Sequence, residues 1–115
     1  MSDIYISFYL RANRIHIFVD ALRAIGCPER ICFLMSQSGD KLIVAPYGKR
    51  DLLSHNVPKK VYEGKNGLEI SSFKLCTIIA NIHNWDFSKS YRVIGNVVHT
   101  HNVIIYDLNK ATAIL

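Results

Sequence analysis

The stretch "DIYISFYLRANRIHIFVDALRAIG", Asp3–Gly26, decides the architecture that this sequence predicts. Apolar residues alternate with others along "DIYISFYL", which is the period of a strand with one buried side. "RIHI" follows as a second short extended piece. "FVDALRAIG" then places Val19, Leu22 and Ile25 on one helical face. Gly26 suits the position after a helix C-terminus, so the stretch predicts two short strands followed by a helix.

The segments that follow extend this pattern and then repeat it. "RICFLM" and "KLIVAPY" are expected to be strands joined by the turn "SQSGD". Further along, "KVYEGKNGLEI" is expected to contain a strand, an Asn66-Gly67 turn and a short extended piece. "SSFKLCTIIANIHNW" is expected to be a helix with Ser71 or Ser72 as its N-cap, and "YRVIGNVV" and "NVIIYDL" to be the last two strands.

The two parts of the chain can be aligned by register. Aligning "KLIVAPY" with "NVIIYDL" matches Leu42 with Val103, and it matches the turn at Ser38–Asp40 with the turn at His99–His101. We therefore expect an α+β fold built from two tandem β-α-β-β units that pack as a pseudo-dimer, with antiparallel-rich sheets and one helix per unit. A single unit of this size cannot cover the open face of its own sheet.

The composition fits one compact domain. Of the 115 residues, 50% are hydrophobic and 20% are charged, so a packed core is expected. We expect a single domain over residues 1–115, with pseudo-repeat halves 1–48 and 60–108 and a basic linker 49–59.

The cysteines and the apolar runs indicate a cytoplasmic location. Cys27, Cys32 and Cys76 are an odd number without the spacing of a disulfide framework, which favours reduced thiols. The first residues lack the basic n-region of a secretion signal. No apolar run reaches the roughly 18 residues that a membrane helix needs, so no membrane partner is expected.

Basic residues exceed acidic ones, most clearly in the middle of the chain. The net charge is +5. Residues 49–65 contain Asp51 and Glu63 against a larger basic set: Lys49, Arg50, Lys59, Lys60 and Lys65. A run of this kind is typical of a solvated linker, and it is also a mild indication of a nucleic-acid or acidic partner.

The stretch "NRIHIFVDALRAIGC" resembles the AbrB-type swapped-hairpin domain. Arg14, Ile15 and Ile17 match the opening of the family pattern, Ile25-Gly26 match its close, and a hairpin follows. Two such modules in one chain are similar to the MraZ arrangement. The resemblance implies a DNA-binding regulator, usually dimeric, in which Arg14 and Arg23 contact DNA.

The sequence also departs from the family pattern. Asn13 stands where the family has Gly, and Phe18 stands where it has Pro. The Leu22-Arg23 pair comes one residue late, and residues 60–108 lack the Arg motif. The second half therefore shares only the expected order of elements.

The arginines also point to nucleic acid by their positions alone. Arg11 and Arg14 lie in a polar connection between two extended segments, and Arg23 lies off the apolar face of its helix. Together these three arginines are expected to form a positive patch that contacts double-stranded DNA. The alternative is that they are separate charges scattered over the protein surface. The complete set of expected DNA contacts is Arg11, Arg14, Arg23, Lys49, Arg50, Lys59 and Lys60.

No motif in the sequence indicates catalysis or a cofactor. His99 and His101 are expected at a hairpin tip, and two nitrogens are too few for a closed zinc site. Cys27 and Cys32 are too far apart for a Cys-x-x-Cys redox motif, and no glycine-rich phosphate loop is present. Strand tyrosines such as Tyr5 and Tyr9 are expected to pack, with base stacking as the alternative. We expect no enzyme, no metal and no cofactor.

The alternative function is protein–protein interaction without a nucleic-acid role. In that case "KLIVAPY" or "NVIIYDL" would be an exposed strand that pairs by its edge with a protein partner or with a second copy. Repeated β-α-β units also build sliding clamps, so a clamp-like fold is a further analogy.

Overall fold

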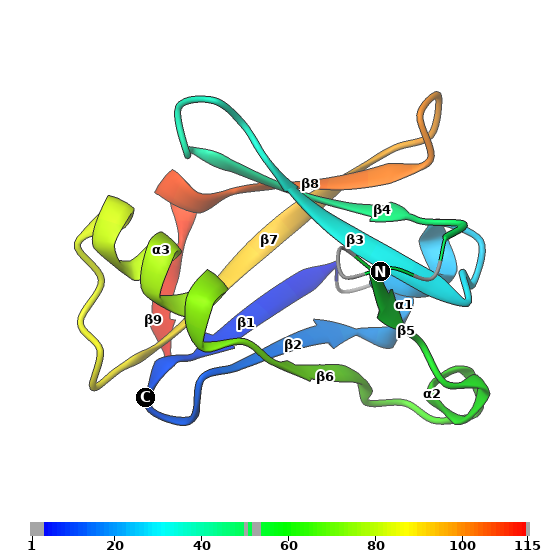
Figure 1. Cartoon of the computed structure of the whole chain (residues 1–115), viewed down its shortest axis with the longest axis horizontal. Helices are drawn as coiled ribbons and strands as arrows, with labels where there is room; N and C mark the ends of the chain where they lie inside the picture. Colours follow the sequence, from blue (N-terminus) through cyan, green and yellow to red (C-terminus); the bar gives the residue numbers. More distant parts are fainter. Residues whose placement is uncertain (1–3, 50, 52–53, 115) are drawn as a thin grey trace.

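The protein folds as a strand-rich α+β domain in which one antiparallel sheet curls into a nearly closed barrel (Figure 1). The computed structural model describes residues 4–49, 51 and 54–114. The strands are β1 (Tyr5–Tyr9), β2 (Arg14–Phe18), β3 (Arg30–Met35), β4 (Lys41–Pro46), β5 (Ser54–Asn56), β6 (Gly67–Ser71), β7 (Ser90–Val98), β8 (Val103–Asp107) and β9 (Thr112–Ile114). The helices are α1 (Val19–Ala24), α2 (Lys59–Glu63) and α3 (Phe73–His83), with short 3-10 turns η1 (Leu10–Ala12) and η2 (Leu108–Lys110).

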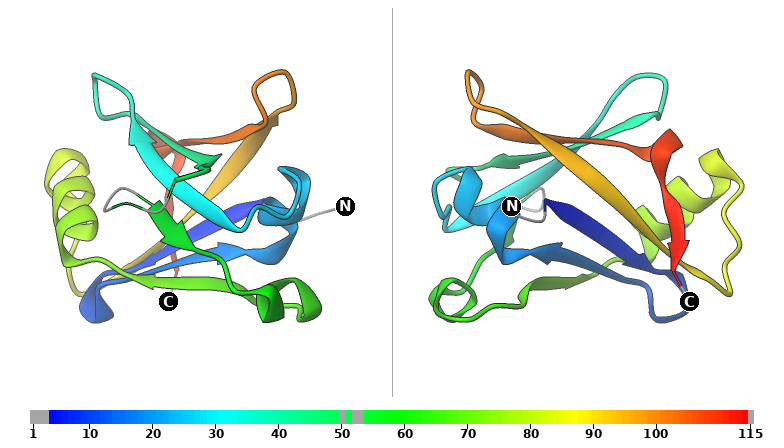
Figure 2. Two further views of the ribbon diagram at one scale, coloured as in Figure 1. Left: turned by 45° about the vertical axis from the view of Figure 1, so that its right-hand side comes forward. Right: turned by 180° about the vertical axis from the view of Figure 1, so that it is seen from behind.

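The strand order around the barrel is β5-β3-β4-β8-β7-β1-β2-β6, with β9 added beside β7. Each of these neighbouring pairs is antiparallel. The expected α+β class and the antiparallel sheets are thus confirmed. Figure 2 shows that the strands wrap around one interior and that both long hairpins, β3–β4 and β7–β8, project on the same side.

The core follows from the alternation that the first strands predict. Ile15 and Ile17 of β2 are completely buried, whereas His16 between them is half-buried and Arg14 before them is exposed. The same period places alternate residues of β1 and β7 in the interior. The largest fully buried side chains of the core are those of Tyr106, Phe8, Ile6, Ile15, Ile17, Leu22, Ile25, Ile31, Leu42, Ile79, Ile104 and Leu108.

Both predicted helices form. Ser72 is the N-cap of α3, and its Oγ accepts a hydrogen bond of 3.2 Å from the backbone N–H of Leu75. This satisfies one of the N–H groups that a helix start leaves free. Gly26 follows α1 with a φ of +91°, the left-handed conformation that glycine adopts at little cost.

The segment "KVYE" differs from the expectation, because it forms α2 and not a strand. Pro58 directly precedes α2 with a φ of −60°, which suits the start of a helix. Gly67 then begins β6 with a φ of +131°, and a Cβ there would lie 2.1 Å from the carbonyl oxygen of Ile17. The second half therefore contains α2 in addition to α3, where one helix per unit was expected.

The expected linker, residues 49–59, also contains regular structure. Its strand β5 pairs with β3, with His55 opposite Ile31. The segment is therefore partly built into the sheet, since backbone hydrogen bonds of β3 need a partner on that side. Arg50 lies outside the described residues.

The two strands proposed as exposed edges lie in the middle of the sheet, which corrects that part of the alternative function. "KLIVAPY" provides β4, which is paired with β3 on one side and β8 on the other. "NVIIYDL" provides β8, which lies between β4 and β7. Strand β4 pairs with β8 over residues 41–44, and β8 pairs with β7 over residues 103–106, so neither is an edge strand. The path of strands ends instead at β5 and β6.

Candidate functional site

The outward side of β7, β1, β2 and β6 carries the most unusual group of side chains in the described part of the chain. Ser7 of β1 lies directly between Arg92 of β7 and His16 of β2, and His16 lies opposite Glu69 of β6. In Figure 1, β1, β2 and β6 form the lower layer and β7 runs diagonally from the lower left up to β8, with α1 and α2 near one end of β2 and α3 near the other. We call this surface the outer face; it comprises Tyr5, Ser7, Tyr9, Arg14, His16, Phe18, Glu69, Ser90, Arg92 and Ile94.

Arg92 is held on the outer face by aromatic rings and not by an acid. Its guanidinium carbon lies 5.0 Å from the centroid of the Tyr5 ring and 5.4 Å from that of the Phe18 ring. These are cation–π distances. None of the ion pairs in the described part of the chain involves Arg92, and its Nε is buried without a hydrogen-bond partner. Among residues 4–49, 51 and 54–114, no acidic side chain forms an ion pair with this partly buried cation.

Ser7 is completely enclosed although it belongs to the outer face. Its Oγ has no hydrogen-bond partner. Leaving a buried hydroxyl unpaired costs about 1–3 kcal/mol. Ser7 and the Nε of Arg92 are thus two unpaired polar groups on directly opposite residues of neighbouring strands.

His16 lies on the other side of Ser7. Its ring centroid is 4.8 Å from that of Phe18. Burial lowers the pKa of His16, and the charge of Arg92 acts in the same direction, whereas Glu69 and the backbone of Asn66 oppose the shift. The imidazole is therefore mainly neutral at neutral pH.

A hollow of about 590 Å³ begins at His16 and extends over β6 to α2. Its polar lining includes Tyr9, Lys60, Asn66 and Glu69. A volume of this size is in the range of small-ligand sites. Lys60, one of the expected DNA contacts, is therefore adjacent to the outer face.

Arg11 and Arg14 lie near the same surface. Arg14 is part of it, and its guanidinium forms an ion pair of 3.2 Å with Glu69 in which both side chains are about half exposed, 55% and 56%. Such a surface pair is worth about 0–1 kcal/mol and is readily exchanged for another anion. Arg11 is exposed in η1, the turn that joins β1 to β2.

The structure does not bring Arg23 together with Arg11 and Arg14. Arg23 lies in α1, beyond the opposite end of β2, and five strand residues span about 16 Å. Its guanidinium donates to the backbone carbonyls of Tyr62 at 2.9 Å and Gly64 at 3.1 Å, and it lies 3.6 Å from Asp20. Arg23 therefore fastens α1 to the C-terminal end of α2.

The remaining expected contacts are dispersed. Lys59 and Lys60 are exposed on α2, and Lys49 is exposed just after β4. Sequence reasoning missed the centre of the outer face. The available signal was a single arginine in the apolar run "YRVIGNVV" and the alternating Tyr5, Ser7 and Tyr9, but nothing in the sequence places these segments side by side.

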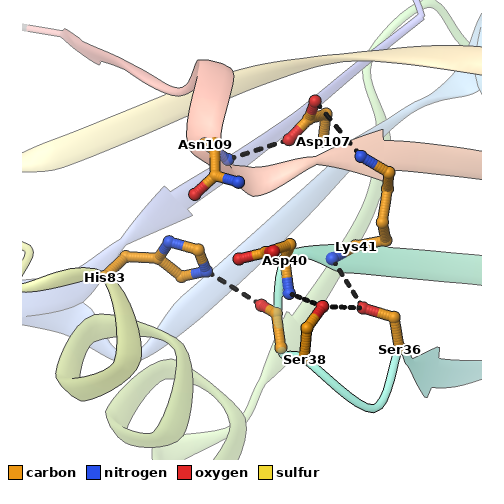
Figure 3. A network of polar contacts seen from close by, with 8 residues as sticks. Ser36, Ser38, Asp40, Lys41, His83, Asp107 and Asn109 are labelled. Carbon is orange, nitrogen blue, oxygen red and sulfur yellow. Dashed lines mark hydrogen bonds and ion pairs between the residues drawn. The ribbon is translucent and has the colours of Figure 1, made fainter.

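A second polar cluster has a structural explanation. Figure 3 shows the turn between β3 and β4 in contact with α3 and with the end of β8. His83 Nε2 lies 2.9 Å from the carbonyl oxygen of Gly39, and Lys41 forms an ion pair of 3.3 Å with Asp107. Ser36 Oγ accepts from the backbone N–H of Lys41 at 2.9 Å. The polar groups of this cluster pair with one another, and they hold the hairpin tip against α3.

His99 and His101 lie at the exposed tip between β7 and β8, as predicted. Within residues 4–49, 51 and 54–114, no group of three or more His, Cys, Asp or Glu side chains is arranged to hold a metal ion. Cys32 and Cys76 are buried, and burial raises the pKa of Cys76 to about 11. Cys27 is exposed and also unpaired.

Comparison with known proteins finds no family model, no curated protein and no solved structure that matches this chain. Among the described residues, no helix has the length and apolar character needed to cross a membrane.

Proposed function

We propose that this protein is a small DNA-binding accessory or regulatory protein of AbrB-like type, and that the outer face with the adjoining η1 turn is its nucleic-acid interface. The observation that carries the proposal is the gathering of Arg11, Arg14 and Arg92 at one surface, where Glu69 is the acidic member. Arginine forks match phosphate geometry, and aromatic neighbours such as Tyr5 and Phe18 offer stacking surfaces. The Lys59–Lys60 pair adds charge beside this face.

The strand pairings support the proposed pseudo-dimer. One unit would be β1-β2-α1-β3-β4 and the other β5-β6-α3-β7-β8, with α2 as an insertion. In that division each hairpin pairs with the opposite unit, because β3 pairs with β5, β7 pairs with β1, and β4 pairs with β8. This exchange is what the swapped-hairpin resemblance implies. Strand β5, which lies in the expected linker, corresponds to β1 in that it pairs with the hairpin of the other unit, but among the described residues it does not pair with β6 as β1 pairs with β2.

The hairpin tips support the same division. The β3–β4 tip meets the end of α3 through Gly39 and His83, at 2.9 Å. The β7–β8 tip meets the end of α1, where the side-chain amide of Asn102 donates to the carbonyl oxygen of Ile25 at 2.9 Å. Each hairpin thus rests on the helix of the other proposed unit.

The three unpaired cysteines support a cytoplasmic location, since reducing compartments keep thiols free. We therefore propose a cytoplasmic protein that binds nucleic acid and has no catalytic role.

The proposal is tested by binding to a mixed-sequence duplex of about 30 base pairs at about 50 mM and about 200 mM salt. Affinity should fall steeply with salt and should fall again in Arg11→Ala/Arg14→Ala. The matched control is Lys41→Ala/Lys110→Ala, which removes the same charge from β4 and η2, on the side of the barrel away from the outer face. No binding at low salt, or equal losses in both double variants, contradicts the proposal.

The ends of the strand path favour a second candidate, pairing with a protein. Strand β6 is hydrogen-bonded to β2 and lies at the end of the path, and no strand among the described residues pairs with its other edge, where an added strand could bind. A mass that rises with concentration in sedimentation equilibrium would support self-pairing. A monomeric mass at all concentrations would contradict it.

A further inference from the structure

We propose that Arg92, Ser7 and His16 form a phosphate-binding site at the centre of the outer face. The phosphate belongs either to a nucleic-acid backbone or to free phosphate, and the first source rests on the proposed function. The three residues come from β7, β1 and β2 and form one row across the strands.

The spacing of the row suits one phosphate. Neighbouring strands are about 4.8 Å apart, so the Cα atoms of Arg92 and His16 are about 10 Å apart with Ser7 between them. A serine is short, and the long side chains on either side of it can contact one anion from opposite directions. Ser7 is completely buried in the free protein, so the side chains over it must move apart for an anion to reach its Oγ.

Arg92 supplies the permanent positive charge. Contact with the rings of Tyr5 and Phe18 orients the guanidinium and holds it out of bulk water. No acid in the described part of the chain forms an ion pair with it. Within the described residues, an anion that binds to Arg92 therefore has no ion-pair partner to displace, unlike one at Arg14, which is paired with Glu69.

The unpaired polar groups supply the hydrogen bonds. The Oγ of Ser7 and the Nε of Arg92 are both buried without partners. Phosphate oxygens accept hydrogen bonds from both kinds of group. Leaving these two atoms unpaired destabilises the free protein, and hydrogen bonds to a bound phosphate would remove that destabilisation.

His16 supplies a proton-dependent third contact. The groups that face it are Glu69 from β6, Arg92 from β7 and the backbone of Asn66, and Ser7 is its neighbour on β1. In the free protein, burial lowers the pKa of His16. A phosphate between His16 and Arg92 would stabilise the imidazolium, so the pKa of His16 must rise when phosphate binds.

The surroundings favour a phosphate that is part of a nucleotide chain. Arg14 and Arg11 continue the positive surface toward the η1 turn, and the hollow of about 590 Å³ continues from His16 toward Lys60. A simple carboxylate would use only the Arg92 end of this arrangement. A polyanion would contact the whole arrangement, from Arg92 to Arg11 and along the hollow to Lys60.

The test is an NMR titration of the histidine rings in the full chain, in sodium phosphate and in sodium chloride at equal ionic strength. Phosphate should raise the pKa of His16, and the ring signals of His101, at the exposed hairpin tip, serve as the internal reference. The rise should vanish in Arg92→Met and persist in Lys110→Met, which removes one charge from η2. Arg92→Lys keeps the positive charge but loses the planar guanidinium, so it should retain part of the phosphate-induced rise in the pKa of His16. This variant replaces Arg92→Met if Arg92→Met does not fold.

The same variants, assayed on the duplex and on a single strand of equal length, identify the source of the phosphate. Arg92→Met should lower the slope of log affinity against log salt by about 0.7–0.9, which is the loss of one phosphate contact, and Lys110→Met should not. A phosphate-dependent pKa at His16 without binding to either nucleic acid would retain the site, assign it to free phosphate and remove the proposed function. Nucleic-acid binding that Arg92→Met and Lys110→Met weaken equally, with no phosphate effect on His16, would remove the site and retain the proposed function.

Discussion

The inner and outer sides of β1, β2 and β7 differ in which side chains they bury and in whether the buried polar atoms have hydrogen-bond partners. On the inner side, Ile6, Phe8, Ile15, Ile17 and Val93 are all fully buried and wholly apolar. On the outer side, an arginine rests on aromatic rings, and two polar atoms, Ser7 Oγ and Arg92 Nε, are buried without hydrogen-bond partners among the described residues; the inner side has one such atom, the hydroxyl of Tyr106 opposite Gly95. Stability explains the inner side, because burial of an aliphatic side chain contributes about 1.5–3 kcal/mol. It does not explain the outer side, and polar groups that cost free energy in the free protein are typical of functional surfaces.

The largest effect should come from a core truncation on the inner side. Ile17→Ala removes a fully buried side chain between Ile6 of β1 and Leu68 of β6 and should lower the free energy of unfolding by about 2–5 kcal/mol. The matched control is its neighbour on the other side, Phe18→Ala, which should cost less because Phe18 is only partly buried. Equal losses in urea unfolding would contradict the division into two sides.

The next effect concerns Gly95 on the inner side of β7. A Cβ at this position would lie 2.6 Å from Cε1 of Tyr106 and 2.8 Å from Cγ2 of Ile104, both of which are fully buried. Gly95→Ala should therefore lower the free energy of unfolding by about 1–3 kcal/mol through overpacking. Thermal unfolding measures this loss. An unchanged midpoint would mean that Tyr106 can move aside and that the core is looser than its packing indicates.

A smaller effect is expected from replacing the two buried serines, Ser7 and Ser54, by alanine. The two substitutions should change the free energy of unfolding in opposite directions. Ser7→Ala removes an unpaired hydroxyl and should leave stability unchanged or raise it by about 1 kcal/mol, while phosphate binding weakens. Ser54 is also buried, but its Oγ accepts from Arg30 Nε at 2.8 Å and donates to the carbonyl oxygen of Asp51 at 3.2 Å. Ser54→Ala should therefore lower stability by about 1 kcal/mol in the same urea titrations. A loss in Ser7→Ala as large as that in Ser54→Ala would show that Ser7 has a structural partner.

The smallest effect is the pH dependence that His16 contributes. Its pKa in the folded state lies below the ordinary value of 6.5, mainly because of burial, so the unfolded chain binds a proton more readily. The stability contribution of the neutral ring is fully present above pH 6.5 and is lost as the pH falls from 6.5 through the folded-state pKa. His55 acts in the same direction, again mainly through burial. His16→Gln should therefore reduce, but not remove, the acid-induced loss of the free energy of unfolding, because His55 still contributes.

Local patterns determined most of the individual elements. Alternation in "DIYISFYL" predicted β1, the apolar face through Val19 and Leu22 predicted α1, and the serines at 71 and 72 predicted the start of α3. Each of these signals acts between residues close in sequence, through side-chain periodicity or a capping hydrogen bond. The sequence by itself also identified Arg11 and Arg14 as exposed residues next to a strand connection.

Only the tertiary structure decided which segments meet. The helix α2, Lys59–Glu63, was missed because a helix of five residues is too short to show a helical period, and its C-terminal carbonyls are held by Arg23 from α1. The pairing of β4 with β8 places two expected edge strands at the centre of the sheet. Arg92, Ser7 and His16 likewise become neighbours only when β7, β1 and β2 pair. Strand order depends on which long-range pairing buries the most apolar surface with all backbone groups satisfied, and no local pattern contains that information.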